Sequence, residues 1–192
     1  AVRPNQIFAI SLPFPLLAEA DAEAVLSTVG QTLLTSYGLR TLSPHDPRYR
    51  GDYGGDRVRR DGAYHQGPVW PWLIGAYVEA HARIHGDPAA ALALLRPFAE
   101  HLADACLGSI SEILEGDPPH QPRGAVAQAW SVAEVLRVWR KLAREAAIMT
   151  AESAEVAEQA SDRPAFLCDL AALRETSLDD FTTKTRRHQV GQ

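Results

Sequence analysis

Residues 61–72, DGAYHQGPVWPW, gather side chains that can form hydrogen bonds with a ligand and stack on it. They include an acid, a tyrosine, a histidine, a glutamine and two tryptophans, punctuated by two glycines and two prolines. A pyranose ring offers apolar faces to aromatic side chains and hydroxyl groups to amides. This mixture of residue types therefore favours a sugar as the ligand.

Carboxyl groups suited to glycosidic chemistry lie in two loops. Hydrolysis of a glycosidic bond requires two of them, one to protonate the leaving oxygen and one to activate water or attack. Asp56 and Asp61 are the candidates in the first loop, and Glu112, Glu115 and Asp117 are those in the second. Each residue type is equally suited to a solvated or helix-capping acid, so both interpretations stay open.

No motif for another common chemistry is present in the sequence. It has no Gly-rich phosphate loop, no GxSxG elbow and no Cys/His cluster. His81 and His85 are four residues apart on a predicted helix, but no third ligand lies nearby in the sequence. We interpret them as histidines on a solvated helix face. We therefore expect neither a metal nor a cofactor.

Helical periodicity predicts the elements that position these residues. Apolar spacing and capping residues indicate helices from Asp21 to Gly38, from Pro71 to Gly86, from Asp87 to Leu102, and over residues 124–143. In the last helix we expect these side chains to face the core: Val126, Trp130, Ala133, Leu136 and Leu142. No segment alternates as a strand does, so we predict an all-α chain whose long loops, 43–68 and 108–124, meet at one end.

Length, charge and cysteine usage narrow the class of protein. A chain of 192 residues, 46% hydrophobic, is long enough for one domain with a packed core. Its net charge of −5 and scattered Lys and Arg predict no nucleic-acid partner. The apolar run from Ile7 to Leu17 is too short to span a membrane and is interrupted by prolines, so we expect no membrane partner. Cys106 and Cys168 form no CxxC pair, which favours a reducing, cytoplasmic location.

Four segments resemble the C-terminal glucosidase region of glycogen debranching enzymes, the amylo-α-1,6-glucosidase type. They are RPNQIFAISLP, GLRTLSPHDPRYRGDYGGD, RDGAYHQGPVWPWLIGAYVEA and RGAVAQAWSVAEVLR. The resemblance implies the C-terminal part of an (α/α)6 barrel, with about five or six of its twelve helices in this chain. It does not extend to the end of the chain, so we predict two domains: 1–144, the barrel part, and 145–192, a helical extension with a tail.

The resemblance also implies roles for individual residues. Related barrels carry the catalytic base on a glutamate in the loop before a helix that contains WS, which selects Glu112, with Glu115 as the alternative. The sugar-binding residues would be Arg3, Asn5, Gln6, Asp61, Tyr64, His65, Gln66, Trp70, Gln128 and Trp130. Trp70 would form an aromatic wall, whereas Trp72 would face another way and pack in the core. The alternative for Arg3, Asn5 and Gln6 is a plain N-terminal helix cap.

The implied function is inverting hydrolysis of glucosyl α-1,6 stubs on glycogen or another branched α-glucan. No acid in this chain matches the general acid of the family, which we expect upstream, in the remainder of the same enzyme. We therefore expect the isolated chain to be inactive and to self-associate through an uncovered apolar face. The alternatives are a non-catalytic glucan-binding or scaffold remnant, and a related glucoamylase- or trehalase-like α-glucosidase.

Overall fold

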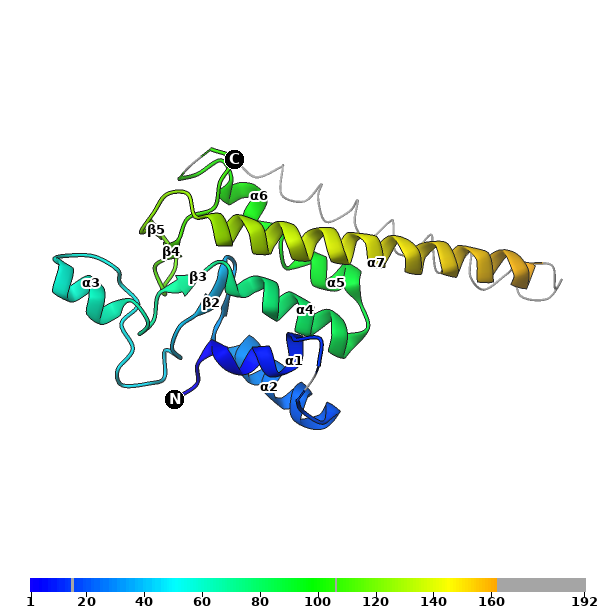
Figure 1. Cartoon of the computed structure of the whole chain (residues 1–192), viewed down its shortest axis with the longest axis horizontal. Coiled ribbons are helices and arrows are strands. Elements are labelled where there is room, and N and C mark those ends of the chain that lie inside the picture. Colours follow the sequence, from blue (N-terminus) through cyan, green and yellow to red (C-terminus); the bar gives the residue numbers. More distant parts are fainter. Residues whose placement is uncertain (15, 106, 162–192) are drawn as a thin grey trace, which may run out of the picture. The chain divides into compact units, whose positions relative to one another are not determined.

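The computed structural model of the chain describes residues 1–14, 16–105 and 107–161, and this part is mostly helical (Figure 1). Cys106 and the predicted tail from residue 162, with Cys168, lie outside the described residues. The helices are the 3-10 helix η1 (Pro4–Ile7), α1 (Phe8–Ser11), α2 (Glu19–Thr32), α3 (Arg57–Ala63), α4 (Leu73–His85), α5 (Pro88–Ala93), α6 (Pro97–His101) and α7 (Ala129–Ser161). No helix among the described residues is both long and apolar enough to cross a lipid bilayer.

Contacts divide the chain into two units. The first comprises Ala1–Ala146 and the second Ala147–Gln192. Every residue of the predicted site belongs to the first unit, which the following paragraphs describe.

Two helix boundaries follow the capping chemistry that the sequence indicates. α4 ends at Gly86, whose φ of 63° is left-handed and whose N–H donates to the carbonyl oxygen of Ala82 at 2.9 Å. α5 begins after Asp87, whose carboxylate accepts from the N–H of Ala90 at 2.8 Å. Glycine tolerates the left-handed conformation and aspartate supplies a short acceptor, so both predicted boundaries are confirmed.

Two other predicted helices are shorter than expected. The helix predicted from Asp21 to Gly38 spans Glu19–Thr32, and Ala18 rather than Asp21 occupies its cap position. The helix predicted over residues 87–102 is divided into α5 and α6, and α6 starts at Pro97. Proline has no backbone N–H to donate and its ring crowds the preceding turn, so one continuous helix cannot pass through Pro97 undisturbed.

Five short antiparallel strands form one sheet in the order β1-β2-β3-β4-β5, beside the beginnings of α4 and α7 (Figure 1). They are β1 (Leu34–Thr35), β2 (Gly38–Arg40), β3 (Val69–Trp70), β4 (Ile113–Leu114) and β5 (Pro122–Arg123). The prediction of a chain without strands is therefore wrong. Strands of two or three residues are too short to show the alternation by which a sequence indicates a strand.

The sheet joins the two long loops. Val69 of β3 pairs with Leu114 of β4, so the end of the first loop lies beside the hairpin formed by β4 and β5. Farther from the sheet, the N–H of Gly116 donates to the carbonyl oxygen of Gly51 at 2.7 Å. The prediction that the two loops meet is confirmed, although the sheet that joins them was not predicted.

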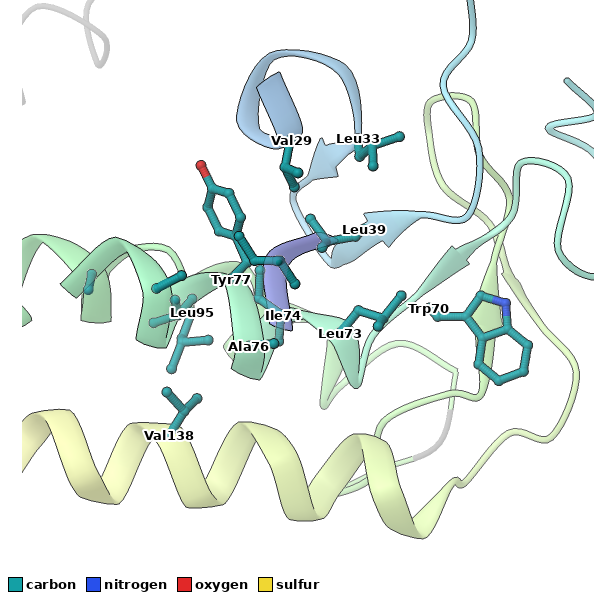
Figure 2. Packing of buried hydrophobic residues seen from close by; sticks show 14 of the residues in the cluster. Val29, Leu33, Leu39, Trp70, Leu73, Ile74, Ala76, Tyr77, Leu95 and Val138 are labelled. Atoms are coloured by element: carbon teal, nitrogen blue, oxygen red, sulfur yellow. The ribbon is translucent and has the colours of Figure 1, made fainter. Parts of the chain in front are cut away.

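Helix α4 runs through the hydrophobic core and anchors the loop that precedes it (Figure 2). On one side of α4, Tyr77 points toward Val29 of α2. Its hydroxyl lies so close to α2 that a Cβ added at Gly30 would be 2.6 Å away. On the other side lie Leu95 and Val138, the latter from α7. Packing on both sides fixes the start of α4, where the candidate site lies.

Helix α7 buries a different face from the predicted one. Of the five side chains expected in the core, only Leu142 is buried, whereas the others are exposed: Val126, Trp130, Ala133 and Leu136. The stripe that packs on the core contains Val135, Val138 and Leu142. α7 carries a second apolar stripe, and there Leu136 is 57% and Trp139 52% exposed. The apolar spacing does not distinguish the two stripes, because both repeat at helical intervals.

Ion pairs set the rotation of α7 against α4. Glu79 of α4 accepts from Arg137 at 3.0 Å and also from Lys141. Such half-exposed pairs add at most about 1 kcal/mol each to stability, but they turn one face of α7 toward α4. They thereby help to place Trp130, which lies in the first turn of α7.

Candidate functional site

A cleft of about 480 Å³ lies where the N-terminus, the first loop and the start of α7 meet. Most of its lining is aromatic or apolar, and a few polar side chains complete it. The lining residues are Arg3, Pro4, Asn5, Phe8, Thr41, Tyr64, His65, Trp70, Trp72, Leu73 and Trp130. Five of the residues predicted to bind sugar line this cleft together with Trp70: Arg3, Asn5, Tyr64, His65 and Trp130. Its size suits a small ligand.

Three tryptophans form one wall of the cleft. The ring of Trp130 lies 5.6 Å from that of Trp72, nearly parallel at 29°, and 5.6 Å from that of Trp70, edge to face. Trp72 stacks in turn on Phe8 at 5.9 Å. The exposed position of Trp130, which contradicts the core role that helical spacing predicted, is the one that the predicted binding role requires.

The two tryptophans of the opening motif differ in burial in the opposite sense from the sequence expectation. Trp70 is only 4% exposed and belongs to the hydrophobic core, whereas Trp72 is half-buried. The indole N–H of Trp70 donates to the carbonyl oxygen of Tyr64 at 3.1 Å. Both rings line the cleft, but Trp72 is the more accessible of the two. Trp72 packs against the core, as expected, but Trp70 is the more deeply buried of the two, because the rings of Tyr64, His65 and Trp130 cover it.

The side chain of Arg3 binds protein groups around the cleft. Its guanidinium donates to the carbonyl oxygens of Thr41 at 3.0 Å and His65 at 2.6 Å, and to Oε1 of Gln66 at 3.0 Å. Gln6 donates to the carbonyl oxygen of Arg3 at 3.0 Å, and neither Gln6 nor Gln66 lines the cleft. Arg3 therefore ties the N-terminus to the first loop. Its side chain caps no helix, although Arg3 holds the cap position of η1.

Glu112 lies one hydrogen bond behind the cleft wall. Its Oε1 accepts from the hydroxyl of Tyr64 at 2.7 Å, and its Oε2 accepts from the N–H of Ala125 at 2.8 Å. The carboxylate is half-buried. A Cβ added at Gly124, whose φ of 68° is left-handed, would lie 2.5 Å from Oε2, so a larger residue there would displace the carboxylate from its present position. Two neutral donors thus hold Glu112 beside the aromatic wall.

The other candidate acids are engaged elsewhere. Glu115 accepts from Arg123 at 2.7 Å, and Asp117 accepts from the hydroxyl of Tyr49 at 2.9 Å. Helix α3 is a short helix inside the predicted loop. Asp56 caps it by accepting from the N–H of Arg59 at 2.9 Å. Asp61, on the same helix, pairs with Arg57 at 3.4 Å, is exposed and does not line the cleft. Each of these acids has a structural partner.

Gln128, two residues before Trp130, forms hydrogen bonds with the backbone of the chain. Its side-chain oxygen accepts from the N–H of Ala129 at 3.1 Å, and its backbone N–H donates to Ile110 at 2.9 Å. It does not line the cleft. Gln128 thus joins the start of α7 to the segment before Glu112, and its predicted contact with sugar stays a prediction.

His101 holds the segment that carries Glu112 and was not predicted from the sequence. It is buried, and its Nε2 accepts from the N–H of Ser111 at 3.1 Å, which places the ring proton on Nδ1. Burial lowers the pKa of His101 from its ordinary 6.5, while the charge of Asp104 raises it by a smaller amount. No sequence motif marks this residue, because the partner is a backbone N–H ten residues away.

Acid is expected to destabilise the chain through His101. Between pH 6.5 and the lower folded pKa, the unfolded chain binds a proton that the folded chain does not, so the free energy of unfolding falls as pH falls. Once protonated, Nε2 can no longer accept, so the N–H of Ser111 loses its hydrogen-bond acceptor. An unpaired buried N–H costs about 1–3 kcal/mol of folding free energy. The measurement is the melting temperature at pH 7 and pH 5 of the wild-type chain and of His101→Gln, whose amide oxygen accepts without titrating. An equal fall in both would contradict this account.

The histidine pair on α4 does not form a metal site with three ligands. The rings of His81 and His85 are 4.4 Å apart, and Nδ1 of His85 lies 4.0 Å from Glu23. The described part of the chain contains no group of three or more His, Cys, Asp or Glu side chains arranged to hold a metal ion.

A stacked aromatic cleft suits a sugar ring, and the half-buried carboxylate beside it is one of the two carboxyl groups that hydrolysis of a glycosidic bond requires. The chain belongs to the amylo-alpha-1,6-glucosidase family, whose model matches residues 1–137. A stretch of 90 residues is 32% identical to the glycogen debranching enzyme of Saccharomyces cerevisiae (strain ATCC 204508 / S288c). That stretch covers 44% of this chain and 6% of the yeast protein, so the chain spans a small part of its relative. The resemblance stated from the sequence is confirmed.

Proposed function

We propose that the chain is the part of an amylo-α-1,6-glucosidase that carries the catalytic base. The substrate would be a glucosyl stub on glycogen or a similar branched α-glucan in the cytoplasm, and hydrolysis would invert the anomeric centre. Glu112 would remove a proton from the attacking water, and the aromatic cleft would hold the glucosyl ring. A general acid from a preceding segment would protonate the leaving oxygen.

The observation that carries this proposal is the environment of Glu112. Among the described residues no ion pair involves Glu112, and both of its oxygens accept from neutral donors. Hydrogen bonds to both oxygens fix the orientation of the carboxylate, as the removal of a proton from a positioned water molecule requires. Glu115, the alternative base, is held by Arg123 at 2.7 Å, and this pairing makes it the weaker candidate.

The cleft supports a sugar as ligand. Trp72 and Trp130 line it with aromatic surface, and Asn5 and His65 lie exposed at the same cleft with polar groups for hydroxyls. Arg3 offers less than the sequence suggested, because its donors are already bound to protein carbonyl and amide oxygens. In this proposal Arg3 and Gln66 shape the cleft, while the aromatic rings contact glucose.

The second apolar stripe of α7 supports a partner segment. Leu136 and Trp139 are large apolar side chains that are more than half exposed, and they repeat at helical spacing on one face. The yeast relative is far longer than the matched stretch. We propose that a preceding segment of the same polypeptide completes an (α/α)6 barrel on this face, with residues 1–144 as the C-terminal part of the barrel. The chain joined to that segment is called the full-length protein below.

The test is the stereochemistry of glucose release. The full-length protein is mixed with a limit dextrin that carries single glucosyl α-1,6 branches, and the first released sugar is followed by proton NMR. Inversion predicts that β-glucose appears first and then mutarotates. The isolated 192-residue chain, lacking the proposed acid, is expected to release no glucose from the same dextrin.

Three results would overturn parts of this proposal. Early release of α-glucose would indicate retention, and the role of Glu112 as base to water would be wrong. If the full-length protein binds the dextrin but releases no glucose, the chain is a glucan-binding or scaffold remnant. Glucose release from another α-glucoside, such as trehalose, in place of the dextrin would keep the chemistry and change the substrate.

A further inference from the structure

We propose that Tyr64 is a positioning residue that orients the carboxylate of Glu112 and links it to the sugar-binding wall. This inference rests on the proposed function, since it concerns how the base of that reaction is held. Its basis is that one side chain lines the cleft with its ring and binds the carboxylate with its hydroxyl.

The two donors to Glu112 hold opposite ends of the carboxylate. The hydroxyl of Tyr64 binds Oε1 at 2.7 Å and the N–H of Ala125 binds Oε2 at 2.8 Å. With one bond on each oxygen, the plane of the carboxylate is fixed. Each oxygen still has capacity to accept a further bond, from a water molecule for example. Removing the hydroxyl would free one end and let the carboxylate turn about the other.

The ring of Tyr64 is itself held by its neighbours. It lies edge to face with Trp70 at 4.8 Å and with His65 at 4.9 Å. Its carbonyl oxygen accepts from the indole N–H of Trp70 at 3.1 Å, so backbone and ring are fixed by the same residue. These contacts hold the ring in the position from which its hydroxyl donates to Glu112.

Tyr64 remains a donor over the whole range in which such an enzyme works. Burial, and then the hydrogen bond and charge of Glu112, raise the pKa of Tyr64 to about 12. The phenol is thus protonated near neutral pH. It gives Glu112 a hydrogen bond without a positive charge, unlike the Arg123 side chain that binds Glu115.

The experiment replaces Tyr64 by Phe in the full-length protein, which removes the hydroxyl and keeps the ring. Substrates are the branched limit dextrin and α-D-glucosyl fluoride, whose leaving group needs little protonation and so isolates the step that uses the base. We expect kcat to fall by about 10–100-fold on both, as for a misplaced catalytic group. KM, and the Kd of the iminosugar 1-deoxynojirimycin measured by tryptophan fluorescence, are expected to change less than about threefold.

The matched control is Tyr53→Phe. Tyr53 lies 5.8 Å from Tyr64 ring to ring, and no hydrogen bond from its hydroxyl to Glu112 occurs in the described part of the chain. Its kcat is expected to stay within about threefold of wild type. Tyr64→Phe is also combined with Glu112→Gln. Because the hydroxyl acts through the carboxylate, the double variant should be no slower than Glu112→Gln alone. Unfolding temperatures of all variants show that they are folded.

The outcomes separate this inference from the proposed function. If Glu112→Gln is slow but Tyr64→Phe keeps the wild-type kcat, the positioning role is wrong and the base assignment stands. A rise in KM with unchanged kcat would show that Tyr64 acts on the substrate rather than on Glu112. A double variant with a lower kcat than Glu112→Gln alone would show the same. If wild type hydrolyses neither substrate, the proposed function fails and this inference fails with it.

Discussion

Replacing Glu112 by Gln in the full-length protein is expected to lower kcat on the branched dextrin by about 10²–10⁴-fold while KM changes little. The amide is nearly the same size and keeps an acceptor for Tyr64 or for Ala125, whose N–H lies 2.8 Å from Oε2. It cannot take a proton from water, so it loses an interaction that is made only in the transition state. The measurement is initial glucose release at saturating and at low dextrin concentration.

Glu115→Gln is the matched control for this prediction. Glu115 is three residues away, and its carboxylate binds Arg123 rather than a neutral donor. We expect that variant to keep kcat within tenfold of wild type. If Glu115→Gln were the slow variant and Glu112→Gln the active one, the base assignment would move to Glu115. A further variant, Glu112→Ala, is supplied with azide and α-D-glucosyl fluoride. Azide needs no base to attack, so formation of β-glucosyl azide would show that the site is folded and that only the base is missing.

The second large effect is expected from truncation of the cleft tryptophans, with different results for the two. Trp70→Ala should lower the free energy of unfolding by about 3–5 kcal/mol, because the ring is only 4% exposed and packs against Tyr64 and His65. Trp72→Ala should cost less stability. It should instead weaken binding of 1-deoxynojirimycin by about 1 kcal/mol or more, roughly fivefold in Kd, if its ring stacks on the sugar.

Denaturant unfolding of the 192-residue chain and fluorescence titration of the full-length protein measure the two effects separately. Val58→Ala is the stability control, since this side chain is 81% exposed on α3 and the change should alter the free energy of unfolding of the 192-residue chain by less than about 0.5 kcal/mol. A stable Trp70→Ala variant with weak inhibitor binding would restore the roles that the sequence suggested.

Helices with strong local signals were predictable, and the sheet was not. Gly86 and Asp87 mark a boundary with chemistry that acts within one turn, so the sequence alone places it. The pairing of Val69 with Leu114 depends on residues 45 positions apart in the chain (114 − 69 = 45). Strands of two residues exist because of that pairing, and nothing in either segment alone requires it.

The candidate site was predictable in its residue types and less so in its geometry. Glu112, Tyr64 and Trp130 were expected at the site from the resemblance, and the structure places Tyr64 and Trp130 at one cleft and Glu112 behind its wall, bonded to Tyr64. The burial of Trp70 depends on rings that the fold brings together from separate segments, those of Tyr64, His65 and Trp130. Likewise, Arg3 reads as a polar ligand group in the sequence, yet it binds backbone oxygens that only the folded loops bring near it.

The hairpin of β4 and β5 affects how the glutamate that corresponds to Glu112 is located in related sequences. Glu112 stands at its open end, where its N–H donates to the carbonyl oxygen of Ala125 at 2.9 Å, and a second bond joins Glu115 to Gln121. These two backbone hydrogen bonds fix the position of Glu112 relative to the start of α7. The count of residues between Glu112 and Trp130, in contrast, includes the hairpin tip around Pro118 and Pro119. A homologue with a longer or shorter hairpin tip can therefore keep this glutamate at the same point in space. The number of residues between the glutamate and the WS dipeptide would nevertheless differ. The corresponding glutamate is therefore identified by aligning the hydrogen-bonded residue pairs of the hairpin, rather than by a fixed spacing to the WS dipeptide.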